Sequence, residues 1–135
     1  MIGIIIVSHG TLCETLIKTS SLILGKQENL IAVPLTPSEG LEDLKEKMRA
    51  ALETLASKEG VLILADMFGG SAANVSTGFL QTHNVGVVSG VNLPMLLESI
   101  LSRASFQDAR KFAKHITEKS RGSIINVGDM HKTCR

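Results

Sequence analysis

The sequence predicts an α/β fold, with an open, mainly parallel, doubly wound sheet, and three observations lead to this prediction. Short runs rich in Val, Ile and Leu recur at residues 2–7, 30–35, 61–65 and 85–89. These runs do not alternate between apolar and polar residues, which is typical of strands buried on both faces of a parallel sheet. A segment with helical features follows each run, and repeated strand–helix alternation is the pattern of an α/β fold.

The first two strands are each followed by a helix-start signal. Thr11, with Glu14 three residues later, matches a capping box, and the helix is expected to stop at Gly25. Residues 36–39, Thr-Pro-Ser-Glu, place Pro at a first helical position. Apolar residues spaced by three and four then predict one buried face on the second helix: Leu41, Leu44, Met48, Leu52 and Leu55.

Turns that contain glycine follow the third and fourth strands. Residues 66–71, Asp-Met-Phe-Gly-Gly-Ser, form the first of these turns, and a helix is expected over residues 72–82. Residues 90–94, Gly-Val-Asn-Leu-Pro, form the second, where Asn92 is expected to cap a short helix over 93–103. Both turns therefore lie between a buried strand and the start of a helix.

The C-terminal part of the chain is expected to complete a single domain. Ser105 with Asp108 resembles another capping box, and an amphipathic helix follows it. Ser123 to Val127 is expected to be a short antiparallel strand at the edge of the sheet. We expect residues 1–127 to form one domain with one hydrophobic core, and residues 128–135 to form a polar, frayed tail.

The composition argues against several classes of protein. A net charge of +1 and the absence of Tyr and Trp give no basis for nucleic-acid binding or for a base-stacking surface. The two cysteines, Cys13 and Cys134, form neither a disulfide framework nor a metal-ligand spacing, which favours a reducing cytosol and predicts no metal site. No apolar stretch approaches the roughly 20 residues that span a bilayer.

The candidate site lies where the strands end. In open α/β sheets, ligands bind beyond the carboxyl ends of the strands. Strand one is followed by His9 and strand three by Asp66, and the strand order 2-1-3-4 would make these two strands neighbours. We therefore expect the imidazole and the carboxylate to lie within hydrogen-bonding reach.

Such a pair can hold a phosphoryl group. Neutral imidazole is a good nucleophile, and a carboxylate bonded to one ring N–H fixes the tautomer and stabilises the charge that forms on the ring. The helix starts that follow Gly10 and the Gly69-Gly70-Ser71 turn can supply backbone N–H groups to a phosphate. Each residue alone is more often a turn or capping residue, and their coincidence favours a phosphoryl carrier that uses His9.

Three segments resemble the enzyme IIA component of the mannose-type sugar phosphotransferase system. They are residues 4–10 (Ile-Ile-Ile-Val-Ser-His-Gly), residues 60–71 (Gly-Val-Leu-Ile-Leu-Ala-Asp-Met-Phe-Gly-Gly-Ser) and residues 90–96 (Gly-Val-Asn-Leu-Pro-Met-Leu). The resemblance extends over nearly the whole chain. It implies that His9 is phosphorylated, that Asp66 supports it, and that the phosphate faces Ser71 and the glycine turn, with Gly10, Gly69 and Gly70 near it.

The resemblance also implies partners and a location. Such a protein is a phosphotransferase component without a cofactor or a small-molecule substrate of its own. It takes phosphate from the phosphocarrier protein HPr and passes it to a IIB protein, which serves a membrane IIC/IID complex. The chain is then expected to be cytoplasmic, peripherally associated with that complex, and homodimeric. In some members of the family the last strand pairs antiparallel at the sheet edge of the other subunit.

Other functions fit these residues less well. The phosphotransfer subunit of a dihydroxyacetone kinase shares the Val-Ser-His strand end, but the Phe-Gly-Gly-Ser and Val-Asn-Leu-Pro segments favour the sugar system. A tetrapyrrole metal chelatase would need a second metal-facing His, a histidine phosphatase would need Arg in place of Ser8, and a regulatory binding module would need neither His9 nor Asp66.

Overall fold

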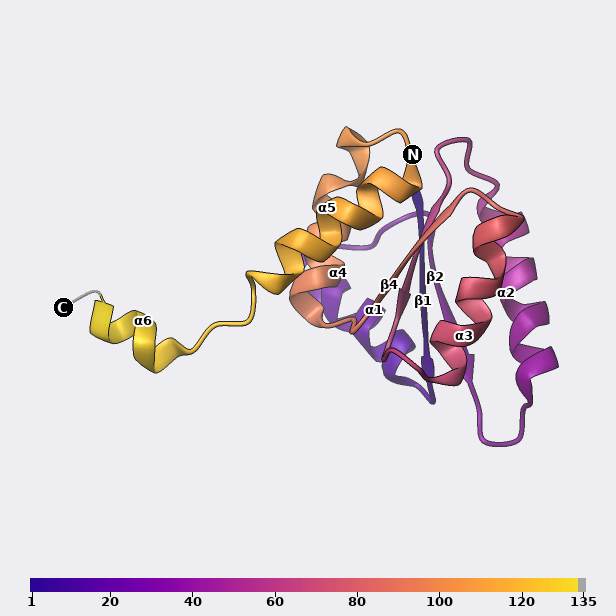
Figure 1. Cartoon of the computed structure of the whole chain (residues 1–135), viewed down its shortest axis with the longest axis horizontal. Coiled ribbons are helices and arrows are strands. Elements are labelled where there is room, and N and C mark those ends of the chain that lie inside the picture. The colour runs from indigo at the N-terminus through magenta and orange to yellow at the C-terminus, as the bar shows by residue number, and fades with distance from the viewer. Residues whose placement is uncertain (134–135) are drawn as a thin grey trace.

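The predicted strands form one parallel sheet (Figure 1). The computed structural model describes residues 1–133, so Cys134 and Arg135 lie outside the described residues. The strands are β1 (Gly3–His9), β2 (Leu30–Leu35), β3 (Val61–Ala65) and β4 (Val85–Ser89). Their order is β2-β1-β3-β4 and every neighbouring pair is parallel, which confirms the predicted fold class and strand order.

Helices cover both faces of this sheet (Figure 1). One face carries α1 (Leu12–Leu24), α4 (Leu93–Ser102) and α5 (Ala109–Arg121), and the other carries α2 (Leu41–Leu55) and α3 (Ser71–Gly78). Short 3₁₀ turns follow α3 and α4, namely η1 (Phe79–Gln81) and η2 (Arg103–Ser105). None of the helices within residues 1–133 is both long and apolar enough to cross a membrane.

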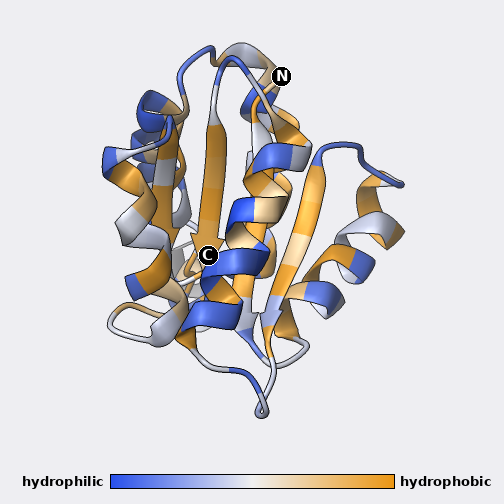
Figure 2. Cartoon of the chain, turned by 90° about the vertical axis from the view of Figure 1, so that its right-hand side faces the viewer, coloured by the Kyte–Doolittle hydropathy of each residue, from blue (hydrophilic) through white to orange (hydrophobic). Residues whose placement is uncertain are grey.

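The strands are hydrophobic along their length because both of their faces are buried (Figure 2). In β1, Ile4 and Ile6 pack toward α1, α4 and α5, while Ile5 and Val7 pack toward α2 and α3. All four side chains are fully buried, and each contributes roughly 1.5–3 kcal/mol of transfer free energy. This two-sided core holds the end of β1, and with it His9, in a fixed position.

The helix starts differ from the sequence predictions at three places. Thr11 is the N-cap of α1 but its side chain makes no capping bond; the buried Ser8 hydroxyl accepts the Cys13 N–H at 2.9 Å instead. The second helix begins at Leu41, because the Glu39 carboxylate turns back to bond Thr36 and leaves residues 36–39 in a loop. Asp108, and not Ser105, caps α5 by accepting the Arg110 N–H.

The segment predicted as a fifth strand is not a strand in this chain. Residues 124–126 have no regular structure, and α6 (Val127–Thr133) replaces most of the predicted frayed tail. The backbone of residues 123–127 has no neighbouring strand to pair with, since the segment leads away from the sheet (Figure 1). Asn126 caps the start of α6, because its side chain accepts the Asp129 N–H and its carbonyl accepts the Met130 N–H.

A buried arginine ties together the end of the sheet opposite to His9. The Arg103 side chain, on η2, is 3% exposed and donates to the carbonyls of Glu28 (2.7 Å), Asn29 (3.0 Å) and Ile2 (3.4 Å). Burial lowers the pKa of Arg103 below its usual value, a change opposed by the nearby Glu28 carboxylate. The residue therefore links the starts of β1 and β2 to the end of α4.

Candidate functional site

The structure brings His9 and Asp66 together at the carboxyl end of the sheet. Because Val7 lies opposite Ala65 in the β1–β3 pair, the residues that follow these two strands are neighbours. The Nδ1 atom of His9 lies 2.7 Å from Oδ2 of Asp66, and the backbone N–H of His9 donates to the same oxygen at 2.9 Å. The carboxylate therefore holds both the ring and the backbone of His9.

The electrostatics of the pair determine which ring nitrogen is available. Burial disfavours the ionised form of Asp66, but the hydrogen bonds from the His9 backbone, the His9 ring and the Met67 N–H outweigh it and lower the pKa of Asp66. An ionised carboxylate can only accept, so Nδ1 of His9 carries the proton. The lone pair then lies on Nε2, on a side chain that is 50% exposed.

The glycine turn packs directly against the histidine ring. Gly69 has φ of +83°, a conformation that favours glycine. A methyl group added at Gly70 would lie 3.2 Å from Cε1 of His9 and 3.1 Å from Cγ of Met67, so a side chain there would press on the ring and on Met67. Gly70 is the N-cap of α3 and Ser71 is its first residue, so Ser71 is not the cap.

Gly10 shapes the turn between β1 and α1, next to His9. Its φ of +59° turns the chain from β1 toward α1, and its N–H donates to the Leu35 carbonyl at 2.8 Å. The carbonyl of Gly10 also accepts the Ser8 hydroxyl at 3.4 Å. The amide of Gly10 is thus already bonded, and the residue shapes the turn next to His9.

The loop of residues 36–40 beside His9, which hydrogen bonds to Glu39 hold in place, was not predicted. Leu35 lies opposite His9 in the β1–β2 pair, and residues 36–40 follow it. The Glu39 carboxylate accepts the Lys47 ammonium, the Thr36 hydroxyl and the Thr36 N–H, which lower the pKa of Glu39 to about 2. Lys47 also donates to the Pro34 carbonyl at 2.8 Å. The Thr-Pro-Ser-Glu pattern had suggested a helix start, and only the distant Lys47 shows why it forms a loop.

A groove of about 410 Å³ lies beside β4, the edge strand nearest the C-terminal segment. It is lined by residues of β4, α4 and α5 and by Ile124. The Ser120 hydroxyl lines it too, buried and without a hydrogen-bond partner among residues 1–133. β4 contains neither Pro nor a charged residue, whereas β2, the other edge, contains Pro34. The β4 edge is therefore the one suited to accept another strand.

The arrangement around His9 can carry out nucleophilic transfer to an anionic group. It combines an exposed ring nitrogen, a carboxylate that fixes the other nitrogen, and the N-terminus of α3. The first turn of a helix leaves backbone N–H groups without intrahelical partners, and these groups attract anions. Within the described residues, no group of three or more His, Cys, Asp or Glu side chains is arranged to hold a metal ion.

Comparisons with known proteins agree with one another. The sequence pattern of the family described as "PTS system fructose IIA component" matches residues 3–117. The chain is 36% identical over 123 residues to the fructose-specific EIIA component of the phosphotransferase system (PTS) of Bacillus subtilis, covering 89% of this chain and 84% of that protein. It is 40% identical over 103 residues to the mannose-specific EIIAB component of Escherichia coli, covering 76% of this chain and 32% of that longer protein.

Solved structures share the fold over almost the whole chain. The phosphotransferase system component EIIA of Streptococcus agalactiae aligns with a TM-score of 0.88 at 29% identity and covers 96% of this chain and 99% of that one. The mannose/sorbose specific IIA subunit of Enterococcus faecalis aligns with a TM-score of 0.84 at 27% identity and covers 93% of each chain. No comparison supports the kinase-subunit or chelatase alternatives.

Proposed function

Because this chain belongs to the PTS system fructose IIA component family, and is a mannose-type EIIA that transfers phosphate via a histidine, we propose that His9 is the residue that carries the phosphate. The observation that supports this assignment is the 2.7 Å contact between Nδ1 of His9 and the Asp66 carboxylate. It leaves Nε2 as the nitrogen that attacks phosphorus.

The transfer follows from this geometry. The Nε2 lone pair forms the new bond to phosphorus while the bond between phosphorus and the donor atom breaks, and the electron pair of that bond leaves with the donor. The proton stays on Nδ1, hydrogen-bonded to Asp66. The positive charge that develops on the ring lies against the ionised carboxylate, which stabilises it. The reverse sequence releases the phosphoryl group to an acceptor.

The phosphate itself is held by the start of α3 in this proposal. Gly70 lies against the His9 ring near Cε1, and Gly69, with its positive φ, turns the chain just before α3 begins. The N–H groups of the first turn of α3 and the Ser71 hydroxyl are the donors that we assign to the phosphate oxygens. Gly10 contributes the turn and not its amide, because that amide is bonded to Leu35.

The proposed partners are those of a sugar phosphotransferase system. HPr supplies the phosphate, and a IIB protein receives it on the way to the membrane IIC/IID complex, which places this chain in the cytoplasm at that complex. The relatives carry the sugar names fructose, mannose and sorbose. In this relay His9 carries only the phosphoryl group, so other components recognise the sugar.

We further propose a homodimer in which residues 123–127 pair antiparallel with the β4 edge of a second copy. In the single chain these residues leave the sheet, and the Ile124, Ile125 and Val127 side chains are exposed. The groove beside β4 is open, and the Ser120 hydroxyl in it is unpartnered among residues 1–133. A strand from the other subunit would fill the groove, offer a partner to the Ser120 hydroxyl and bury Ile124 and Ile125.

One labelling experiment tests the assignment of His9. The purified chain is incubated with phosphoenolpyruvate, enzyme I and HPr, and the phosphate is traced by acid lability and peptide mapping. We expect one acid-labile phosphate on His9 and none on a His9→Ala variant. His83→Ala is the control, since His83 lies after η1, bonded to Thr82, and should label as wild type does. Equal labelling of His9→Ala and wild type would show that the assignment is wrong.

A further inference from the structure

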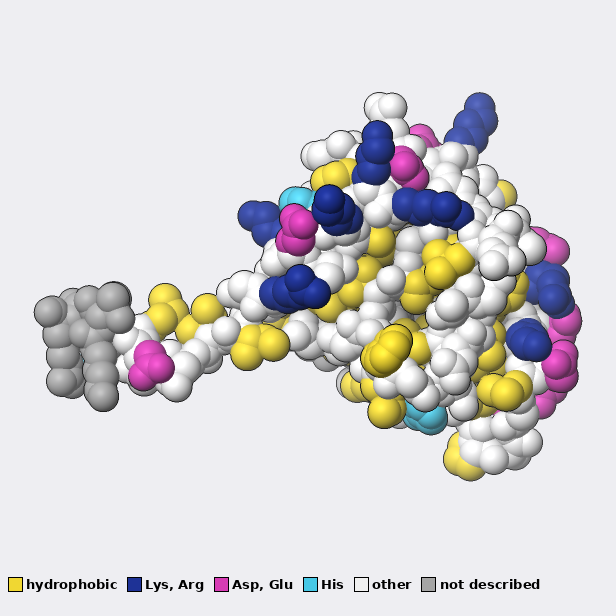
Figure 3. Space-filling view, in the orientation of Figure 1, with side chains coloured by type: hydrophobic (Ala, Val, Ile, Leu, Met, Phe, Trp, Pro, Cys, Tyr) yellow, Lys and Arg dark blue, Asp and Glu magenta, His cyan; other side chains and the backbone are white. Residues whose placement is uncertain are grey.

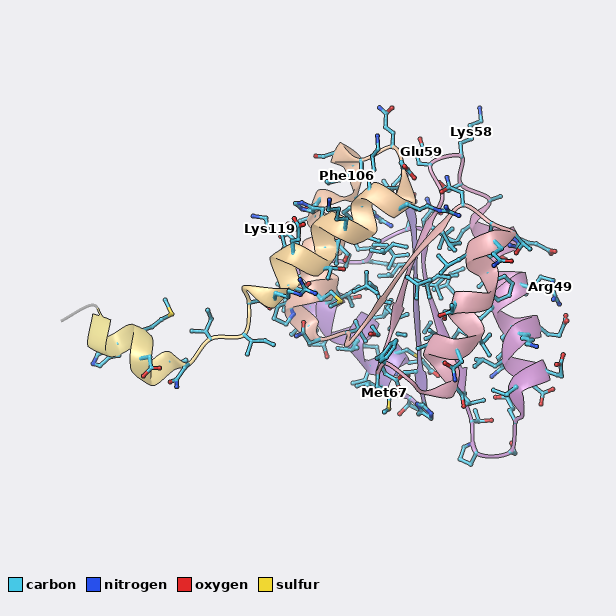
Figure 4. All side chains as sticks on the ribbon, viewed as in Figure 1. Arg49, Lys58, Glu59, Met67, Phe106 and Lys119 are labelled. Atoms are coloured by element: carbon cyan, nitrogen blue, oxygen red, sulfur yellow. The ribbon has the colours of Figure 1, made fainter. Side chains whose placement is uncertain are left out.

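Three exposed apolar side chains follow His9 or Asp66 within three residues along the chain, and we call them the collar: Leu12, Met67 and Phe68. Leu12 is the first residue of α1, three residues after His9, and is 47% exposed. Met67 and Phe68 follow Asp66 in the loop before α3 and are 53% and 88% exposed. In Figure 3 hydrophobic side chains lie beside a histidine at the lower edge of the domain, and Figure 4 labels Met67 at that edge.

Contacts fix Met67, the middle member of the collar, to the site. Its backbone N–H donates to Oδ1 of Asp66 at 2.9 Å, while the His9 groups bond Oδ2 of the same carboxylate. Its side chain and the His9 ring both lie next to Gly70. Phe68 is the next residue along the loop, and its ring is nearly as exposed as a side chain can be. The loop that positions the catalytic carboxylate thus also presents an aromatic ring outward.

A phosphoryl donor has to cover these residues. The donor atom and Nε2 of His9 must both come within bonding range of one phosphorus, so the surface that carries the donor atom closes over the ring and its surroundings. A small phosphodonor would cover only the ring. A protein donor would bury the collar, and aromatic side chains near the centre of an interface often contribute most of its binding energy.

We propose that Phe68 is the principal docking anchor for the protein that phosphorylates His9, received by an apolar patch around that protein's phosphorylated residue. The inference rests on the proposed function and adds to it the chemistry of the donor's surface. Phe68 touches neither the phosphate nor His9 in this role. It raises the affinity of the encounter and leaves the chemistry at Nε2 unchanged.

The test separates docking from chemistry by using two phosphodonors. Phosphoramidate, a small P–N compound, phosphorylates histidine directly, whereas phospho-HPr must dock. We expect Phe68→Ala to lower kcat/KM for phospho-HPr by about tenfold or more, mainly through KM, and to leave labelling by phosphoramidate unchanged. Phe68→Leu should recover much of the loss. Leu22→Ala is the matched control, because Leu22 is 87% exposed but lies far along α1 from His9, and it should behave as wild type with both donors.

Two results would overturn the inference. Wild-type kinetics of Phe68→Ala with phospho-HPr would show that the ring is not an anchor. Equal slowing with both donors would show that Phe68 shapes the His9 site and does not dock. Failure of the proposed function gives a different signature: the wild type itself would take no phosphate from phospho-HPr, and the docking inference would fail with it.

Discussion

Oδ2 of Asp66 accepts two hydrogen bonds from one residue: the backbone N–H of His9 at 2.9 Å and its ring Nδ1 at 2.7 Å. The first bond continues the contact between β1 and β3 beyond the last strand residue, and the second orients the imidazole. One carboxylate oxygen therefore both joins the ends of the two strands and orients the imidazole. Changes at Asp66 should affect the ring far more than the sheet, since the buried strands remain in place.

Asp66→Asn should slow phosphoryl transfer by about a hundredfold or more while the fold is preserved. The amide cannot compensate the charge that forms on the ring, and it no longer selects the Nδ1–H tautomer. Rapid-quench measurement of labelling from phospho-HPr checks the rate, and circular dichroism checks the fold. Asp108→Asn, at the start of α5, is the control and should leave transfer unchanged. Unchanged transfer in Asp66→Asn would remove this residue from the mechanism.

Gly70→Ala should impair transfer by misplacing the ring. The new methyl group would lie 3.2 Å from Cε1 of His9, which is closer than an ordinary van der Waals contact, so the ring or the turn has to shift by a few tenths of an ångström and the transfer rate should fall. The matched control is Gly78→Ala in the same helix, because a methyl group there meets nothing within 4 Å. Equal transfer rates of the two variants would contradict the close packing of Gly70 on His9.

Glu39→Gln should remove a stabilisation that depends on pH. Its hydrogen bonds from Lys47 and Thr36 lower the pKa of Glu39 from 4.5 to about 2. A lowered pKa stabilises the folded state fully above the unfolded value, and this stabilisation is lost as pH falls through the folded value. The difference in unfolding free energy between wild type and Glu39→Gln should therefore be constant above about pH 5 and shrink steadily toward pH 2.

Denaturant unfolding at a series of pH values measures this difference. Glu53→Gln, an exposed change on α2, serves as the reference variant. A difference for Glu39→Gln that stays the same from pH 7 to pH 2 would contradict the role given to its carboxylate.

Arg103→Ala should destabilise the fold by about 3 kcal/mol, because it leaves buried carbonyls of Ile2, Glu28 and Asn29 without their charged donor. The site at the other end of the sheet should still accept phosphate at temperatures where the variant is folded. Urea unfolding gives the free energy. Lys111→Ala, an exposed change on α5, should shift it by less than about 0.5 kcal/mol.

Ile125→Pro should convert the proposed dimer to a monomer. Proline lacks the N–H that an exchanged strand would donate, yet Ile125 lies in irregular backbone in the single chain, so the domain should fold as before. Sedimentation velocity measures the oligomeric state. Leu22→Asp, an exposed change that leaves α1 intact, is the control. A wild-type monomer, or a dimer that persists in Ile125→Pro, would exclude exchange of this strand.

Much of the fold could be predicted from local sequence. The uninterrupted Val, Ile and Leu runs indicated strands with both faces buried, as in a parallel sheet with helices on each side. His9 and Asp66 follow two of these runs directly, so their meeting depended only on those strands being neighbours. The Gly-Gly-Ser turn likewise indicated that a helix starts there. The same short segments carried the family resemblance.

The helix boundaries and the C-terminal segment depended on the tertiary structure. The Ser8 hydroxyl accepts the Cys13 N–H in the first turn of α1 because β1 ends beside that turn. Glu39 stays out of α2 because Lys47, eight residues further on, draws its carboxylate back. Residues 123–127 have strand-like composition, but a strand needs a neighbour to bond with, and residues 1–133 of the single chain offer them none. Local patterns determine which residues prefer a helix or a strand; only the packed chain decides where each buried donor and acceptor finds its partner.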